Sequence, residues 1–217
     1  MKKIVTEGLG LWLGFVCWVN GITTDPYIEL KSGVCMVQKR AGVHYKAAPC
    51  FSGELGISWE SWRLGLEMGY KKFKIKDVDN PSKYYGTVFD TGEFGNLKFS
   101  AVSFMVNFYH DWHYCENLNL YVGFGLGVTR LNYRFSDTQD TFGGGNGVVY
   151  NQDKYLLAAQ VMCGVSYDVS DHWSVSLGYR CMKMESVKYN WIAAEAIWPS
   201  LKTPFLHSLE LGLRYRF

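Results

Sequence analysis

Apolar and polar residues alternate one by one along the last stretch of the chain, residues 205–217. One phase holds Phe205, His207, Leu209, Leu211, Leu213, Tyr215 and Phe217, and the other holds Ser208, Glu210, Gly212, Arg214 and Arg216. A period of two places successive side chains on opposite faces of a β-strand. Most strands have about five or six residues, whereas a tilted membrane-spanning strand needs about nine to eleven. The pattern therefore favours a strand that crosses a membrane.

The same alternation recurs in seven earlier segments, which are 27–37, 51–59, 63–72, 97–109, 118–129, 155–167 and 173–181. The connections between the eight predicted strands alternate in length. Short ones fall near Ser61, near His113 and at Ser170–Asp171, and long polar ones fall at 39–49, 74–95, 134–154 and 187–204. Such alternation is typical of an up-and-down barrel with short periplasmic turns and long outer loops. The barrel must be closed, because an open sheet edge cannot lie in lipid.

A soluble barrel of the lipocalin type would also alternate, with its apolar phase facing inward and its charges facing water. Here the polar phase consists mainly of glycine and serine with scattered charges, which is too sparse for a water-exposed exterior. Aromatic residues also gather near the predicted strand ends, as in the girdles of membrane barrels. The sequence predicts an all-β fold, an eight-stranded antiparallel up-and-down transmembrane β-barrel.

Composition narrows the class of protein further. The chain is 17% aromatic and 19% charged, with a formal net charge of +2. Disordered chains are poor in aromatic residues and carry more net charge, and nucleic-acid-binding domains usually carry a clustered basic surface. We therefore expect a folded protein with no nucleic-acid partner.

The first residues have the features of an export signal. Lys2 and Lys3 precede an apolar run from Leu9 to Val19. A basic start followed by a short apolar run is typical of a secretory signal peptide, and a buried or anchoring helix is the alternative. We expect a signal peptide over 1–24, cleaved on export, and a barrel domain over 25–217.

Three segments carry a resemblance to a known family. They are YVGFGLGVTRLNY from Tyr121, the stretch from Val165 to Arg180, and the closing LGLRYRF from Leu211. Together they resemble the small outer-membrane β-barrel family that includes the opacity-type proteins and the OmpA barrel domain. The resemblance implies a location in the bacterial outer membrane. It also implies that Tyr215 and the terminal Phe217 form the signal by which the outer-membrane assembly machinery recognises the chain.

Charged residues of both signs fall in the phase that faces the barrel interior. Eight strands leave an interior just wide enough to be filled by side chains, so isolated charges there should pair. We interpret them as an ion-paired plug, and a narrow gated ion pathway is the alternative. The predicted lumen network comprises Glu29, Lys31, Glu54, Arg63, Glu67, Lys71, Arg180, Glu210 and Arg214, with Arg216 beside it.

Two chemical motifs bear on enzymatic function. Gly123, Gly125 and Gly127 are spaced by two inside a strand, which does not match the dinucleotide-binding fingerprint and suggests space for larger side chains in the lumen. A lipid A deacylase of this size carries a His-x-Ser pair within a lipid-facing strand, whereas His110, His113 and His172 lie at predicted turns here. We therefore expect no enzymatic activity, no cofactor and no metal site.

Cys35 and Cys50 flank the first long connection, which centres near 42–43. Both fall in the inward phase, and the envelope permits disulfides. The sequence therefore predicts a disulfide between Cys35 and Cys50, provided that the register places them opposite each other.

The predicted function follows from this architecture. We expect a surface-exposed structural anchor that presents four extracellular loops, in the manner of an adhesin or surface antigen. Its expected partners are outer-membrane lipid and lipopolysaccharide, the assembly machinery and a host or cell-surface ligand at the loops. The alternatives are a small gated pore and, less favoured, a lipid A-modifying enzyme.

Overall fold

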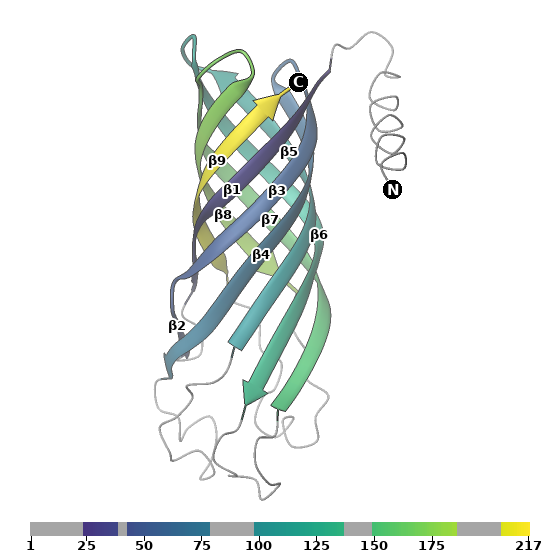
Figure 1. Cartoon of the computed structure of the whole chain (residues 1–217), viewed down its shortest axis with the longest axis vertical. Helices are drawn as coiled ribbons and strands as arrows, with labels where there is room; N and C mark the ends of the chain where they lie inside the picture. The colour runs from purple at the N-terminus through teal and green to yellow at the C-terminus, as the bar shows by residue number, and fades with distance from the viewer. Residues whose placement is uncertain (1–23, 39–42, 79–97, 137–148, 186–204) are drawn as a thin grey trace, which may run out of the picture.

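Eight long antiparallel strands close into a barrel in the computed structural model (Figure 1). The structure describes residues 24–38, 43–78, 98–136, 149–185 and 205–217. The barrel strands are β1 (Asp25–Val37), β3 (Ala48–Trp59), β4 (Trp62–Val78), β5 (Lys98–His113), β6 (Leu118–Ser136), β7 (Val149–Asp168), β8 (Trp173–Met184) and β9 (Leu206–Arg216). Each strand pairs with its neighbours in the chain, and β1 pairs with β9 to close the barrel.

The closing seam is long and regular. β1 and β9 pair without interruption from Tyr27 opposite Arg216 to Val37 opposite Leu206. Both chain ends of the barrel therefore lie at the end that carries the short turns (Figure 1). With no free edge among the eight barrel strands, the backbone polar groups of the wall are paired within the sheet, as a lipid environment requires.

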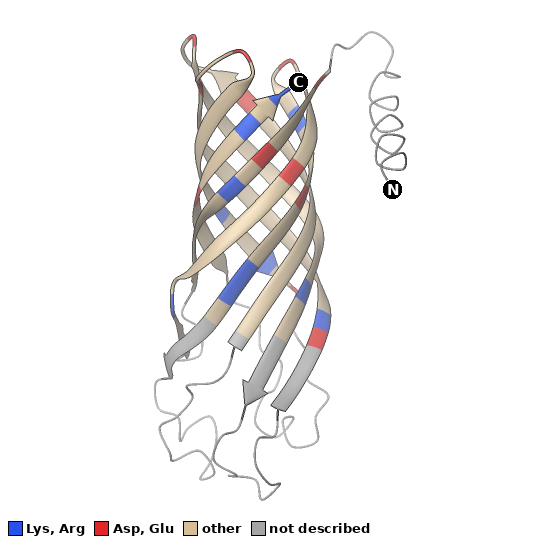
Figure 2. Ribbon diagram, viewed as in Figure 1, with Lys and Arg blue, Asp and Glu red and all other residues tan. Residues whose placement is uncertain are grey.

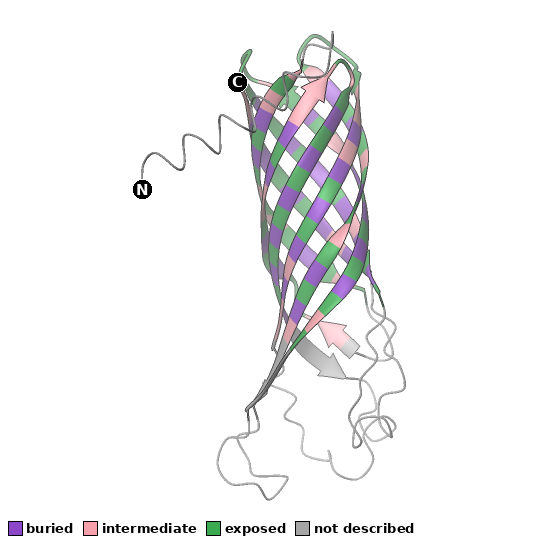
Figure 3. Ribbon diagram, turned by 90° about the vertical axis from the view of Figure 1, so that its right-hand side faces the viewer, coloured by how far each residue is buried: buried purple, intermediate pink, exposed green. Residues whose placement is uncertain are grey.

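Burial alternates along the described side chains of the eight barrel strands, so the two predicted phases become the two faces of the wall (Figure 3). In β8, for example, Ser174, Ser176 and Arg180 are buried, whereas Trp173, Val175 and Leu177 are exposed. The large apolar side chains lie outside and the charged ones inside. This is the inverse of a soluble barrel and matches a wall that faces lipid.

The strands are longer than predicted on one side of the barrel. β4 runs to Val78, β6 runs to Ser136 and β7 begins at Val149. A short extra strand, β2 (Val43–Tyr45), pairs with the outer part of β4. These segments were predicted as loops because their side chains no longer follow a clear apolar alternation. Backbone pairing nevertheless continues past the apolar belt, since it does not depend on lipid-facing side chains.

The tight turn between β3 and β4 contains Glu60, whose φ of 49° lies in the left-handed region. Two-residue hairpin turns require such angles because they match the twist of the strands. Among the described residues, there is no helix long and apolar enough to cross a membrane. The predicted signal peptide over 1–24 lies outside the described residues, except for residue 24.

The predicted disulfide is corrected by the register. Cys35 lies opposite Ala48, and Cys50 lies opposite Gly33, so the two cysteines are diagonal neighbours. Diagonal positions are about 7–8 Å apart, whereas disulfides need Cα atoms within about 6.8 Å. Both side chains point inward, as predicted, but both are free thiols. The prediction placed the centre of the connection one residue too late along the chain.

This correction can be checked by alkylation without reductant. In the folded barrel, Cys35 and Cys50 should be protected, because their exposed fractions are 0% and 2%, whereas Cys115 should react because it is exposed. After unfolding, peptide mapping should find a free thiol at both lumen positions. A Cys35–Cys50 linked peptide would show that the register is different from the one described.

Candidate functional site: the barrel lumen

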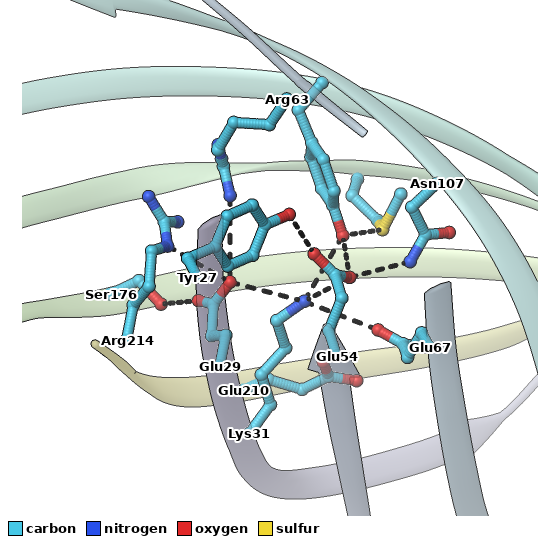
Figure 4. A network of polar contacts seen from close by, with 12 residues as sticks. Tyr27, Glu29, Lys31, Glu54, Arg63, Glu67, Asn107, Ser176, Glu210 and Arg214 are labelled. Atoms are coloured by element: carbon cyan, nitrogen blue, oxygen red, sulfur yellow. Dashed lines mark hydrogen bonds and ion pairs between the residues drawn. The ribbon is translucent and has the colours of Figure 1, made fainter. Parts of the chain in front are cut away.

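The lumen contains a connected network of buried ion pairs in the half nearer the short turns (Figure 2, Figure 4). Glu54 is at its centre. Its carboxylate accepts hydrogen bonds from the hydroxyls of Tyr27 and Tyr109, each at 2.6 Å, from the Asn107 amide at 2.8 Å and from Lys31 Nζ at 3.0 Å. Four donors from β1 and β5 hold one carboxylate, so this charge is fully compensated.

A second cluster joins opposite walls. Arg180 on β8 contacts both carboxylate oxygens of Glu67 on β4, with Nη2 2.7 Å from Oε2, and also lies 2.9 Å from Glu210 on β9. The guanidinium further donates to Gln160 Oε1 at 3.1 Å. Arginine's planar fork of donors suits such bidentate contacts. The lumen is therefore bridged across its full width.

A third cluster lies nearer the turns. Arg63 donates to Asp111 at 2.6 and 2.8 Å, and its guanidinium carbon lies 4.3 Å from the ring centre of Tyr109 and 5.3 Å from that of Tyr121. Cations over aromatic faces gain stabilisation when they are removed from water. The Arg63 guanidinium, packed against these two rings, thus fills this end of the lumen rather than leaving a polar channel.

Further pairs complete the network. Glu29 lies 3.4 Å from Arg214, directly across the closing seam, and accepts from Ser176 at 3.0 Å. Arg216 pairs with Asp168 at 3.0 Å at the rim. The structure thus brings together in the lumen the nine residues that the sequence placed there, with Arg216 at the edge.

Lys71 differs from the other lumen cations. Its ammonium group is buried, and no carboxylate lies within ion-pair distance among the described residues. Its neighbour is the Met182 sulfur at 3.9 Å, and in the register it lies opposite Cys50. It therefore marks the boundary between the charged half of the lumen and the half nearer the long connections.

The described residues of that outer half are mainly apolar, with Ser103 and Thr129 buried among them. Its side chains form a single buried cluster, and Val37 and Phe99 pack against it. The cluster comprises Cys35, Ala48, Cys50, Phe73, Ala101, Met105, Leu131, Leu156, Ala158, Met182, Met184 and Leu206. We call it the apolar tier. The sequence analysis missed it because these residues belong to the same inward phase as the charges, and only the register shows that they gather at one end.

The neutral members of the polar half were missed for a related reason. Tyr27, Asn107, Tyr109, Tyr121 and Gln160 carry no charge, so a pattern of paired charges does not include them. Their inward phase was the available signal. Glycines opposite them make room: a Cβ at Gly123 would come within 2.9 Å of the Tyr109 ring, and one at Gly125 within 3.0 Å of Gln160.

The described part of the lumen is consequently filled. A cavity of about 10 Å³ lies among Lys31, Tyr109, Met162 and Arg180, which is roughly the volume needed to hold one water molecule. In the part of the chain that the structure describes, no group of three or more His, Cys, Asp or Glu side chains is placed to hold a metal ion.

Comparison with known proteins agrees with this geometry. A family model described as the outer membrane protein beta-barrel domain matches residues 20–217. The chain belongs to the outer membrane β-barrel family. The membrane that its apolar exterior faces is therefore the bacterial outer membrane.

Solved structures of outer membrane barrels share the fold. Neisserial surface protein A is 16% identical with a TM-score of 0.54, and the match covers 90% of this chain and 99% of that one. A major outer membrane protein from Thermus thermophilus is 10% identical with a TM-score of 0.60, covering 88% and 99% of the two chains. A search of curated proteins finds no match. At these identities, the likeness establishes the fold alone.

Proposed function

We propose that this outer membrane barrel acts as a closed anchor that presents its four long connections at the cell surface, and that it is neither a pore nor an enzyme. The observation that carries the proposal is the filled lumen. An ion crossing it would have to break the ion pairs and then pass the apolar tier.

Each of these layers opposes conduction for a different physical reason. Breaking a buried pair leaves uncompensated charge in a low-dielectric interior, which costs several kcal/mol. An apolar constriction excludes water, because a hydrated ion there loses its solvent without gaining ligands. Arg180, Arg63 and the apolar tier lie one after another along the lumen. An opening at only one of these levels would therefore not let an ion pass.

The strand ends support the surface role. The connections 38–47, 79–97, 137–148 and 185–205 begin and end at the end of the barrel opposite the start of β1 and the end of β9 (Figure 1). The short turns lie on the periplasmic side in barrels of this kind, so the long connections lie outside. Most of their residues, including Trp191 and Trp198, lie outside the described part of the chain. We propose a host or cell-surface ligand for them.

We expect the wild-type protein to be silent in planar bilayers. Purified protein, shown to be folded by its different gel mobility before and after boiling, should give no stable conductance steps. A variant that opens two levels at once, Phe73→Ser with Arg180→Ser, should give measurable steps if it still folds. Reproducible steps from wild type would overturn the closed-anchor proposal in favour of the small pore.

The surface role needs a separate test. Deleting the connections one at a time, in cells that still insert the barrel, should reduce attachment to host cells or extracellular matrix for at least one deletion. Equal attachment by all four deletion strains and by a strain without the protein would contradict the interaction role. Unchanged lipid A mass in expressing cells is expected, and a changed mass would favour an enzyme instead.

A further inference from the structure

Two hydroxyl groups in the lumen have no hydrogen-bond partner among the described residues. They belong to Ser103 on β5 and Thr129 on β6, whose exposed fractions are 2% and 0%. The two residues lie directly opposite each other in the register, and Ser103 also lies opposite Gly69 on β4. A buried hydroxyl without a partner costs free energy, because it has lost its hydrogen bonds to water. Both hydroxyls are therefore available to bind a further group.

The buried ammonium group of Lys71 lies beside the same place. Lys71 is two residues beyond Gly69 on the inward face of β4. A Cβ built on Gly69 would lie 2.8 Å from Ser103 Oγ and 3.8 Å from Lys71 Nζ. The hydroxyl and the ammonium group thus flank one point, next to a residue that has no side chain, and they do not hydrogen-bond to each other.

The carboxylates of this region are bound to another cation. Glu67, four residues before Lys71 on β4, and Glu210 on β9 both accept hydrogen bonds from Arg180. Lys71 instead donates to the Met182 sulfur at 3.9 Å, and a thioether is a weak acceptor. Since an ammonium group has three N–H donors, the other donors of Lys71 lack a partner among the described residues.

These three groups together favour a negative ion. An ammonium group can only donate, and a hydroxyl without a partner can turn its proton toward the same point. Donors that converge around a positive charge fit an anion and repel a cation. A water molecule would satisfy the hydroxyls, but it would leave the charge of Lys71 uncompensated in a low-dielectric interior.

The anion must be small, because the described side chains around these groups are packed. Ser103 lies between Ala101 and Met105 on the inward face of β5, and both of these neighbours belong to the apolar tier. The stem of Lys71 is flexible, so its charged end is the part that can move to admit an ion. A halide ion meets these conditions, since it is compact and accepts hydrogen bonds from every direction.

From this arrangement, we propose that the lumen binds one halide ion between Lys71 and Ser103, with Thr129 as the second hydroxyl ligand. The ion gives Lys71 a partner of opposite charge at the boundary between the charged half and the apolar tier. Both layers enclose this position, so the ion is taken up as the barrel closes and is retained afterwards. A retained ion carries no current, so the inference can fail or succeed independently of the closed-anchor proposal.

Retention of bromide tests the proposal directly. The purified protein is refolded in sodium bromide and exchanged into sodium gluconate of equal ionic strength, and the bromide is then counted by elemental mass spectrometry. We expect wild type to retain one bromide ion per barrel. Lys71→Met should retain none, because it removes the positive charge at nearly the same length. Ser103→Ala should need about tenfold more bromide during refolding for half occupancy, since one hydrogen bond to a charged group contributes roughly that factor.

Two variants are matched controls. Lys72→Met removes the same charge from the next residue of β4, which is exposed on the outward face. Ser174→Ala removes a buried hydroxyl that already donates to Asp168 at 2.6 Å. Both should retain bromide as wild type does, and gel mobility before and after boiling shows whether each variant is folded.

Unfolding in urea gives a second measurement. Wild type should unfold at a higher urea concentration in sodium chloride than in sodium gluconate, because a ligand of the folded state alone stabilises that state. This difference should persist in Lys72→Met and vanish in Lys71→Met. If Lys71→Met does not fold, Ser103→Ala supplies the test, since it removes only a hydroxyl without a protein partner. Wild type that retains no bromide, or a folded Lys71→Met variant that retains as much as wild type, would overturn the proposal.

Discussion

Replacing Arg180 with methionine should lower the free energy of unfolding of the barrel by about 3–5 kcal/mol, the usual cost of removing one partner of a buried ion pair. Arg180 is buried and is the shared partner of Glu67 and Glu210. Methionine has a similar length but no charge, so both carboxylates would lose their main compensation in the low-dielectric lumen. Denaturant unfolding in zwitterionic lipid vesicles, followed by tryptophan fluorescence, measures the change.

The matched control is Arg130→Met. Arg130 also forms a short ion pair, with Asp153 at 2.6 Å, but the two side chains are 51% and 35% exposed. Solvent screens exposed pairs and they contribute little to stability, so this variant should be nearly as stable as wild type. The double variant Arg180→Met with Glu67→Met should recover part of the loss, since it removes one of the orphaned charges. If Arg180→Met costs no more than Arg130→Met, the lumen network is not closed in the way described.

The second large effect concerns Gly33 on the closing seam. A Cβ at this position would overlap the backbone carbonyl oxygen of Leu209 and lie 2.8 Å from the Cα of Glu210. Because these are backbone atoms of β9, a side chain at residue 33 can be accommodated only by separating β1 from β9. We expect Gly33→Val to abolish the folded barrel, seen as loss of the gel band whose mobility changes on boiling.

Gly53→Val is the corresponding control on the neighbouring strand. A Cβ at Gly53 meets the Leu30 side chain at 3.6 Å, which is ordinary van der Waals contact. This variant should fold and keep the mobility change. A folded Gly33→Val variant would mean that the two strands are farther apart at the seam than the structure shows.

The fold could be predicted from the sequence because the barrel wall has two faces in contact with different media. Lipid on one side and a packed lumen on the other force each strand to alternate, and residues 205–217 record this alternation almost without error. The extensions of β4, β6 and β7 were not predictable in the same way. Beyond Tyr70 and Tyr155, the phase that is apolar within the belt becomes mostly polar in the sequence, while the backbone pairing continues.

The site could be predicted only in part. The alternation along a strand shows whether a side chain such as Glu67 or Arg180 points into the lumen or out of it. It does not show where along the barrel axis that side chain lies. The position along the axis depends on the register between neighbouring strands. In this register Cys35 lies opposite Ala48 and not opposite Cys50. For the same reason, the separation of the lumen into a charged half and an apolar tier became visible only in three dimensions.

The contact between Arg180 and Glu67 also bears on the order of events in folding. These residues are far apart in the sequence and lie on β8 and β4, which are separated by three intervening strands along the wall. In a flat sheet, the spacing of about 4.8 Å between neighbouring strands would hold them roughly 19 Å apart. Their contact is therefore made only when the sheet has curled and β1 has met β9.

Such non-local contacts carry a loop-closure cost that must be met before they contribute stability, which is typical of slow-folding β topologies. The buried ion pairs consequently stabilise only the closed barrel. A half-formed barrel gains little stability from them, so closure of the barrel is expected to be cooperative.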